Sequence, residues 1–180
     1  LEKLDVEVRF NSYLEPDEVA AMGADKVIIA TGSLPTETGF QRAMTQNEIL
    51  PGIELGQVFS PEDVMGRAVR PGKRVIVLDE GGNWRGAGTA WFLAEEGHAV
   101  TLVTPDALIG KELQRTAADW PLRKALRRLG AEFVTESAIA AWRGDGAEIL
   151  DLLNGKTRHL AADSLVMATT NQANTTVAQG

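Results

Sequence analysis

The chain has 180 residues and no cysteine, 44% of its residues are hydrophobic, 24% are charged, and its formal net charge is −7. These values are typical of a globular protein with one domain or two small ones, and the acidic excess argues against a nucleic-acid-binding surface. Without cysteine, and with only two histidines, the sequence excludes disulfides and cysteine-held metal clusters, and we expect no metal site.

No apolar run is long enough to span a bilayer and no signal peptide is visible. We therefore expect a cytoplasmic protein without membrane or nucleic-acid partners. Because the chain begins at Leu1, within a pattern, we also expect it to be part of a longer protein.

The first 60 residues predict short elements joined by a long connection. Residues 6–10 alternate as a strand, and residues 15–22 suggest a helix entered through Pro16. Residues 26–30 read as a buried strand that leads into Thr31 and Gly32. The stretch 34–60 is punctuated by proline and glycine, which is typical of a connection. Ser60 and Pro61 then predict the start of a short helix.

Residues 73–90 hold the most informative motif, K-R-V-I-V-L-D-E-G-G-N-W-R-G-A-G-T-A. A buried strand over 74–78 enters a glycine-rich turn, a helix follows over 86–96, and a second strand covers 99–104. This is a βαβ unit, and the phosphate-binding turn of a dinucleotide-binding fold belongs at its first corner.

The remaining residues alternate between helical and extended patterns. Apolar spacing predicts a helix over 113–129, in which Pro121 either makes a kink or begins the helix afresh. Extended segments follow at 132–135 and 138–142, and Asn154-Gly155 predicts a hairpin between 148–153 and 156–160. Residues 164–168 form a last buried strand. The order predicts an α/β fold: a Rossmann-like parallel sheet with helices on both faces, plus an antiparallel β-meander.

A short motif that occurs twice in approximate form suggests a family. A-D-K-V-I-I-A-T-G at 24–32 is repeated as A-D-S-L-V-M-A-T-T at 162–170. Together with F-S-P-E-D-V-M, G-K-R-V-I-V-L and L-A-E-E-G-H-A-V-T-L-V-T, these motifs resemble the C-terminal nucleotide-binding region of the old-yellow-enzyme-linked NADH:flavin oxidoreductases. That family includes trimethylamine dehydrogenase, histamine dehydrogenase and dienoyl-CoA reductase. The resemblance covers essentially the whole chain.

The resemblance implies a domain organisation and a set of cofactors. Residues 1–57 and 163–180 would be part of an FAD- or ADP-type domain, and residues 58–162 an NAD(P)-type Rossmann-like domain. The partner would be an N-terminal barrel of the same parent, carrying FMN and a 4Fe-4S cluster. This chain would supply no catalytic residue and no metal ligand, and its possible ligands are ADP, FAD or NAD(P).

Three functions stay open at this point. The first is a nucleotide-binding-type domain of an FMN-dependent, amine-dehydrogenase-like oxidoreductase with a degenerate dinucleotide site. The second is a functional NAD(P)H-binding electron-input domain, and the third is an ADP-binding regulatory or scaffold module. The candidate cofactor-binding residues are Thr31, Gly32, Gly81, Gly82, Asn83, Arg85, Gly86 and Thr104.

The turn departs from the usual spacing G-x-G-x-x-G. Asp79 takes the place of the first glycine, and the third place falls on Trp84, or on Gly86 if two residues are inserted. We expect the Asp79 carboxylate to face the pyrophosphate, which is unfavourable by roughly 4 kcal/mol at 4 Å and an effective dielectric of 20. Arg85 could offset part of this repulsion. The following strand ends in Thr104 rather than in the acid that usually binds the ribose.

Overall fold

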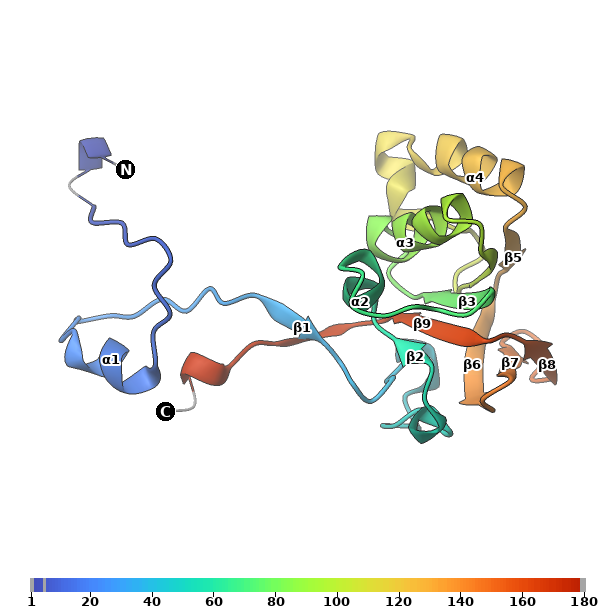
Figure 1. The fold of residues 1–180 in the computed structure, drawn as a ribbon, viewed down its shortest axis with the longest axis horizontal. Coiled ribbons are helices and arrows are strands. Elements are labelled where there is room, and N and C mark those ends of the chain that lie inside the picture. Colours follow the sequence, from blue (N-terminus) through green and yellow to red (C-terminus); the bar gives the residue numbers. More distant parts are fainter. Residues whose placement is uncertain (1, 5, 179–180) are drawn as a thin grey trace. The chain divides into compact units, whose positions relative to one another are not determined.

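The computed structural model describes residues 2–4 and 6–178. The chain divides into two compact units, one made of Leu1–Leu34 with Gln172–Gly180 and the other of Pro35–Asn171. The larger unit holds a five-stranded sheet, a three-stranded sheet and most of the helices (Figure 1).

A five-stranded sheet, parallel throughout, forms the centre of the larger unit. Its strands, in spatial order, are β2 (Val58–Phe59), β9 (Ser164–Ala168), β3 (Arg74–Asp79), β4 (Ala99–Val103) and β5 (Glu132–Val134). Every residue of β9, and every residue of β3 after Arg74, is buried. This burial follows from their near-continuous apolar sequences, which are typical of a sheet covered on both faces.

Helices cover one face of this sheet. They are α2 (Pro61–Met65), α3 (Trp84–Glu95) and α4 (Asp119–Arg128), together with the 3₁₀ segment η4 (Lys111–Thr116). Ser60 caps α2 as predicted, since its side chain accepts a hydrogen bond from the Asp63 N–H. The helix predicted over 113–129 is divided, because Ala117 has a left-handed φ of 54° and α4 begins afresh at Asp119.

The other face is covered by an antiparallel sheet of β6 (Ser137–Trp142), β7 (Gly146–Asp151) and β8 (Thr157–Ala161). Alternate residues of β3 belong to two hydrophobic cores, one on each face of the sheet. Val75 and Val77 pack with α3 and α4, whereas Ile76 and Leu78 pack with the core that contains Trp142. The α/β class with a parallel sheet and a meander is confirmed. The expectation of helices on both faces was wrong, because the meander itself supplies the second apolar layer.

Residues 35–57 pack with this second core. They include the 3₁₀ segments η2 (Arg42–Met44) and η3 (Ile53–Leu55). Leu50 is buried in the core, and the Gln41 side chain bridges the backbone of Ile139 through two hydrogen bonds of 2.8 and 3.0 Å. The expected boundaries at 57/58 and 162/163 therefore differ from the compact units, which divide at 34/35 and 171/172.

The hairpin of the meander forms around Asn154-Gly155, as predicted, but its tip is longer than two residues. The strands end at Asp151 and begin again at Thr157. The Asp151 carboxylate accepts hydrogen bonds from the N–H groups of Leu153 and Asn154, in addition to the backbone bond from the Gly155 N–H to the Asp151 carbonyl at 2.9 Å.

The smaller unit contains little regular structure. Its elements are η1 (Glu2–Leu4), α1 (Pro16–Ala21), η5 (Thr176–Ala178) and most of a pair of short strands, β1 (Ser33–Pro35) with β10 (Asn171–Ala173). Pro35 and Asn171, one end residue of each strand, belong to the larger unit. The strands predicted at 6–10 and 26–30 are not formed in the described chain. Val27 and Ile28 are 52% and 92% exposed, because no neighbouring strand covers them here. None of the helices built from the described residues has the length and apolarity of a membrane span.

Candidate nucleotide site at the turn between β3 and α3

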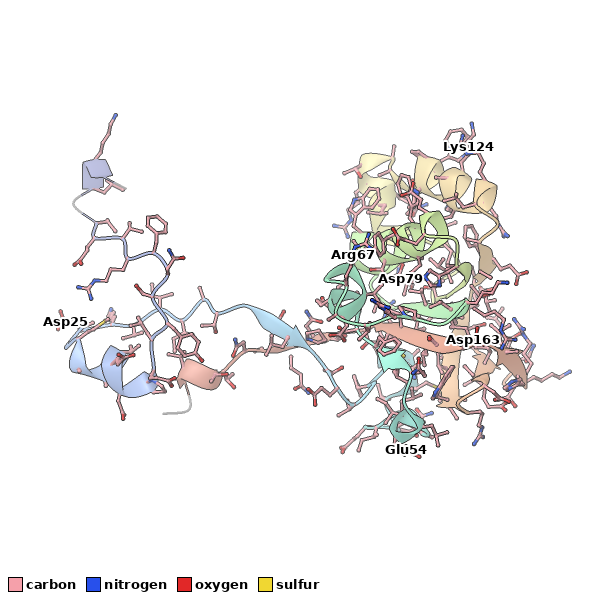
Figure 2. All side chains as sticks on the ribbon, in the orientation of Figure 1. Asp25, Glu54, Arg67, Asp79, Lys124 and Asp163 are labelled. Atoms are coloured by element: carbon pink, nitrogen blue, oxygen red, sulfur yellow. The ribbon has the colours of Figure 1, made fainter. Side chains whose placement is uncertain are left out.

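The candidate site lies where β3 ends and α3 begins, at the carboxyl edge of the parallel sheet (Figure 2). Asp79, the last residue of β3, pairs in register with Ala168 of β9. The turn runs from Glu80 to Asn83, whose side chain caps α3 by accepting a hydrogen bond from the Arg85 N–H at 2.9 Å. A glycine-rich turn between a buried strand and a helix N-terminus has the geometry that cradles phosphate in dinucleotide-binding folds.

Asp79 points into the protein. It is 0% exposed, and its Oδ1 accepts a hydrogen bond from the Gly82 N–H at 3.0 Å. Its Oδ2 is buried without a hydrogen-bond partner among the described residues. The expectation that this carboxylate faces a bound pyrophosphate was therefore wrong. Its carboxyl group instead accepts a hydrogen bond from an N–H group of the turn from inside the protein.

The protonation of Asp79 reflects this position. Burial raises its pKa to about 7, and the nearby charge of Asp106 acts in the same direction. The N–H groups of Gly82 and Gly81 and the charge of Arg42 act in the opposite direction, but they do not outweigh burial. The carboxyl group consequently titrates near neutral pH.

Gly86 carries the function of the third glycine in the motif. A Cβ at this position would collide with the Asp79 carboxyl group, so only glycine allows α3 to approach β3 this closely. Of the two alignments that the sequence left open, the structure favours the one with two inserted residues. Trp84 is half-exposed at the first position of α3 and does not fill the turn.

The two other glycines shape the turn. Gly82 is buried with a left-handed φ of 59°, and its carbonyl accepts a hydrogen bond from the Glu112 N–H at 2.9 Å. Gly81 is exposed, and a Cβ there would lie 2.9 Å from the Asn83 Nδ2. The turn therefore keeps the backbone form of a phosphate cradle.

Arg85 is committed to partners within the chain. Its Nε and one terminal nitrogen bind the two carboxylate oxygens of Glu62 at 2.7 and 2.8 Å, and the other terminal nitrogen binds the Thr169 carbonyl at 2.7 Å. The hydrogen bond from Arg85 is the largest cause that lowers the pKa of Glu62. Arg85 thus ties α2, α3 and the end of β9 together, and it does not neutralise Asp79.

Two acidic residues that the sequence reasoning missed organise the rest of this edge. Glu80 is 3% exposed, and it accepts hydrogen bonds from the N–H groups of Arg42 and Ala43 at 3.0 and 3.2 Å; burial raises its pKa. Asp106 forms ion pairs with Arg42 and Lys111, both at 3.0 Å. Asp106 lies three residues after the end of β4 at Val103, and this position was the available signal, since dinucleotide sites place an acid near the end of that strand.

The remaining candidate residues, Thr104, Thr31 and Gly32, do not line the open space at the turn. Thr104 is completely buried, and its hydroxyl accepts a hydrogen bond from the Asp106 N–H. Thr31 and Gly32 belong to the smaller unit, where both bond to the backbone of Asn174. The open space at the turn measures about 240 Å³ and is lined by Glu80, Gly81, Asn83, Arg85 and residues 168–171. It is smaller than the roughly 300–1,000 Å³ of ordinary ligand pockets.

Among the residues that the structure describes, no cluster of three histidine or acidic side chains suits a metal ion.

The fold and the turn define an α/β domain of the dinucleotide-binding type. The family model for pyridine nucleotide-disulphide oxidoreductases matches residues 3–180, and the chain belongs to this family. "Probable N-methylproline demethylase" of Rhizobium meliloti (strain 1021) is 30% identical over 149 residues, which are 83% of this chain and 20% of that protein.

Two solved structures agree with this assignment. 6-Hydroxypseudooxynicotine amine oxidase of Pseudomonas geniculata N1 is 31% identical with a TM-score of 0.85, over 94% of this chain and 25% of that one. Histamine dehydrogenase of Rhizobium sp. 4-9 is 26% identical with a TM-score of 0.87, over 97% and 27%. The chain thus spans between 20% and 27% of the length of these relatives. It matches the C-terminal part of amine-dehydrogenase-like, old-yellow-enzyme-linked flavoproteins, which confirms the resemblance found in the sequence.

Proposed function

We propose that this chain is the nucleotide-binding-type portion of a larger FMN-dependent, amine-dehydrogenase-like oxidoreductase, and that its turn at β3 and α3 is a closed, structural form of a dinucleotide site. One observation carries the proposal: the Gly82 N–H is already bound by the buried carboxylate of Asp79. Arg85, the cation in the first turn of α3, is likewise held by Glu62 and Thr169. A pyrophosphate would have to compete with these internal partners.

The partner in this proposal is the remainder of the parent protein. An N-terminal barrel with FMN and a 4Fe-4S cluster would supply the chemistry, and this chain would supply no catalytic side chain. The proposal is supported by the small share of its relatives that the chain covers, and by the exposed apolar run Val27, Ile28 and Ile29. We assign residues 1–34 and 172–180 to the FAD- or ADP-type part, and residues 35–171 to the NAD(P)-type part. A cytoplasmic location belongs to the same proposal and is tested by fractionating cells that express the parent.

A second function is an electron-input domain that binds NAD(P)H. It is favoured by the retained backbone of the turn: Gly82 keeps its left-handed φ and Gly86 keeps its close packing. Under this function the Asp79 carboxyl group would become protonated or move when the dinucleotide arrives. The third function, a module that binds only ADP, has no comparable support at this turn.

Calorimetric titration of the 180-residue chain with NADH, NADPH and ADP separates the three functions. We expect no binding of NADH or NADPH at micromolar concentrations, because the Asp79 carboxyl group already binds the Gly82 N–H that a pyrophosphate would need. Micromolar affinity for either dinucleotide would overturn the closed-site proposal and support the second function. Binding of ADP alone would support the third, and repeating the titration with Asp79→Asn shows whether the charge at this position is what excludes dinucleotides.

A further inference from the structure

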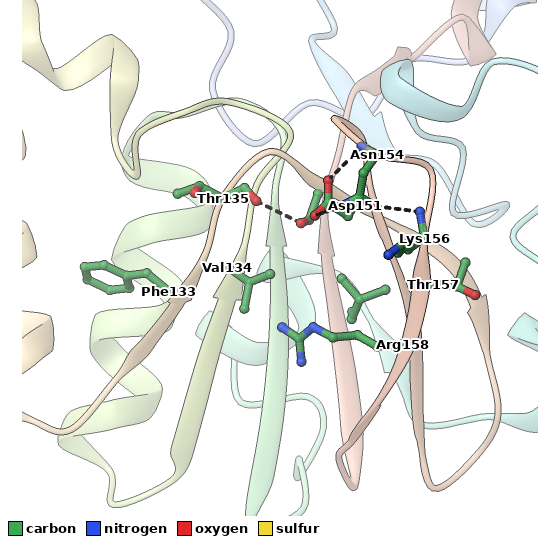
Figure 3. A pocket seen from close by; sticks show the side chains of 10 residues that line it. Phe133, Val134, Thr135, Asp151, Asn154, Lys156, Thr157 and Arg158 are labelled. Atoms are coloured by element: carbon green, nitrogen blue, oxygen red, sulfur yellow. Dashed lines mark hydrogen bonds between the residues drawn. The ribbon is translucent and has the colours of Figure 1, made fainter.

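A second cavity lies away from the turn, between the two sheets of the larger unit. It has a volume of about 490 Å³, which is within the usual range for small-molecule sites. Phe133 and Val134 of β5 line one side, and Ile149, Asp151, Lys156 and Arg158 of the hairpin line the other (Figure 3). It shares no residue with the candidate nucleotide site. We call it the hairpin groove.

The strand register places a cation on the inner face of the meander. Arg158 of β8 lies opposite Ile149 of β7, and Leu160 lies opposite Ala147. Residues that oppose each other in an antiparallel pair share one face of the sheet. Ile149 and Ala147 are buried in the core that joins the two sheets, so Arg158 projects from that same face. Figure 3 shows its side chain reaching from β8 toward Val134. Arg158 is exposed, so its guanidinium group is accessible to a ligand from solvent.

The residues that line the hairpin groove include two cations, Lys156 and Arg158, and one carboxylate, Asp151. Within residues 2–4 and 6–178, the side chains of Arg158 and Lys156 have neither an ion pair nor a hydrogen bond. The carboxylate of Asp151 lines the same groove, but the hairpin tip uses both of its oxygens. Oδ1 accepts from the Leu153 and Asn154 N–H groups, and Oδ2 accepts from the Asn154 side chain at 2.8 Å. Two free cations therefore face an apolar wall in a protein of net charge −7.

We propose that the hairpin groove binds a small organic anion, with its charged oxygens on Arg158 and Lys156 and its apolar body against Val134 and Ile149. The planar guanidinium group presents paired N–H donors that match a carboxylate or phosphate. Lys156 and Arg158 are two residues apart along an extended segment, so both side chains can face one ligand. The hydroxyl of Ser137 already donates to the Thr135 carbonyl at 2.8 Å, and the charges of Arg158 and Lys156 favour an anion over a neutral ligand.

Isotope-labelled chain, titrated with phenylbutyrate and followed by NMR, tests the proposal. Phenylbutanol and phenylbutylamine serve as neutral and cationic probes of the same shape, and inorganic phosphate as an anion without an apolar body. We expect phenylbutyrate to shift the amide signals of residues 133–137 and 149–158. The alcohol, the amine and phosphate should each bind at least about tenfold more weakly. Equal binding of any of the three, or shifts confined to other residues, would overturn the proposal.

Variants identify the residues responsible. Arg158→Gln should weaken phenylbutyrate binding by at least about tenfold, and Lys156→Gln should weaken it in the same direction. Arg128→Gln, which removes an exposed cation of α4, is the matched control and should leave binding unchanged. A folded Arg158→Gln variant with unchanged affinity would contradict the proposal. If that variant does not fold, Lys156→Gln and the map of wild-type shifts decide the matter.

Discussion

The carboxyl group of Asp79 packs against Gly86 so closely that a Cβ on residue 86 would overlap it. The contact joins the last residue of β3 to the first turn of α3, across the place where dinucleotide-binding domains hold a pyrophosphate. The Asp79 carboxyl group thus binds an N–H group of the turn from inside the protein, and the missing side chain of Gly86 makes room for it. The buried position of Asp79 therefore depends on the absence of a side chain at residue 86.

Gly86→Ala tests this contact. The added methyl group has no space, so the free energy of unfolding should fall by about 1–3 kcal/mol. Gly88→Ala is the matched control, because the nearest atom to its Cβ would be 3.9 Å away, on Trp84. Alanine is the better helix former, so this control should gain about 0.5–1 kcal/mol. Urea denaturation at neutral pH measures the free energy of unfolding of both variants. Equal changes in the two would show that the Asp79 carboxyl group moves aside at little cost.

The pH dependence of stability tests the burial of Asp79. Its pKa is about 7 in the folded protein against an ordinary 3.8, so the folded state binds the proton more tightly than the unfolded state. The free energy of unfolding should therefore fall as the pH rises from about 4 to about 7, and then level off. Asp79→Asn should reduce this decline, to which Glu80 also contributes because burial raises its pKa, and should make the protein more stable at pH 8, by at most about 4 kcal/mol. Denaturation curves across this range measure the effect, and parallel profiles for the two proteins would contradict it.

The Arg85–Glu62 pair is tested by a double-mutant cycle. Arg85→Ala, Glu62→Gln and the double variant should give a coupling energy of about 0.5–1 kcal/mol at pH 7, since Arg85 and Glu62 are 24% and 47% exposed and solvent weakens the pair. The pKa of Glu62 is lowered in the folded protein, so this coupling should be lost as the pH falls below the ordinary value of about 4. A coupling energy of zero would show that Arg85 contributes only through Thr169.

Gln41→Ala tests whether residues 35–57 are an integral part of the larger unit. Its side chain serves both the N–H and the carbonyl of Ile139, so truncation leaves two buried backbone groups unpaired. We expect a loss of about 1–3 kcal/mol, with faster hydrogen exchange of the Ile139 amide. Gln114→Ala, at an exposed position of η4, should change neither quantity. Unchanged exchange at Ile139 would mean that this segment contributes little to the core.

Much of the larger unit could be predicted because its signals are local. The apolar runs of β3, β4 and β9 and the Asn154-Gly155 pair each indicate an element without reference to the rest of the chain. The run at 26–30 shows the limit of such signals. It has almost the same pattern as β9, yet β9 lies between β2 and β3, whereas Val27 and Ile28 are exposed. A pattern reports that a strand could be buried, and only tertiary structure supplies the neighbours.

The candidate site was predictable in its residues but not in their directions. Spacing identified Gly81, Gly82 and Gly86. The inward rotation of Asp79 depends on a free N–H at Gly82 and on the missing Cβ at Gly86, a combination that spacing does not encode. The partner of Arg85 was equally hidden, because Glu62 is 23 residues earlier in the chain. Such long-range pairs decide whether a charged residue can receive a ligand.

The strand order of the parallel sheet has a consequence for synthesis on the ribosome. β9 is the last strand of the sheet to be made, yet it lies between β2 and β3, and Val75 of β3 pairs with Ser164 of β9. Until residue 168 has left the ribosome, the nascent chain exposes two unpaired strand edges, one on each side of the gap that β9 will fill. Such edges invite pairing with other chains, so late insertion of β9 is the step at which this fold is most exposed to aggregation during translation.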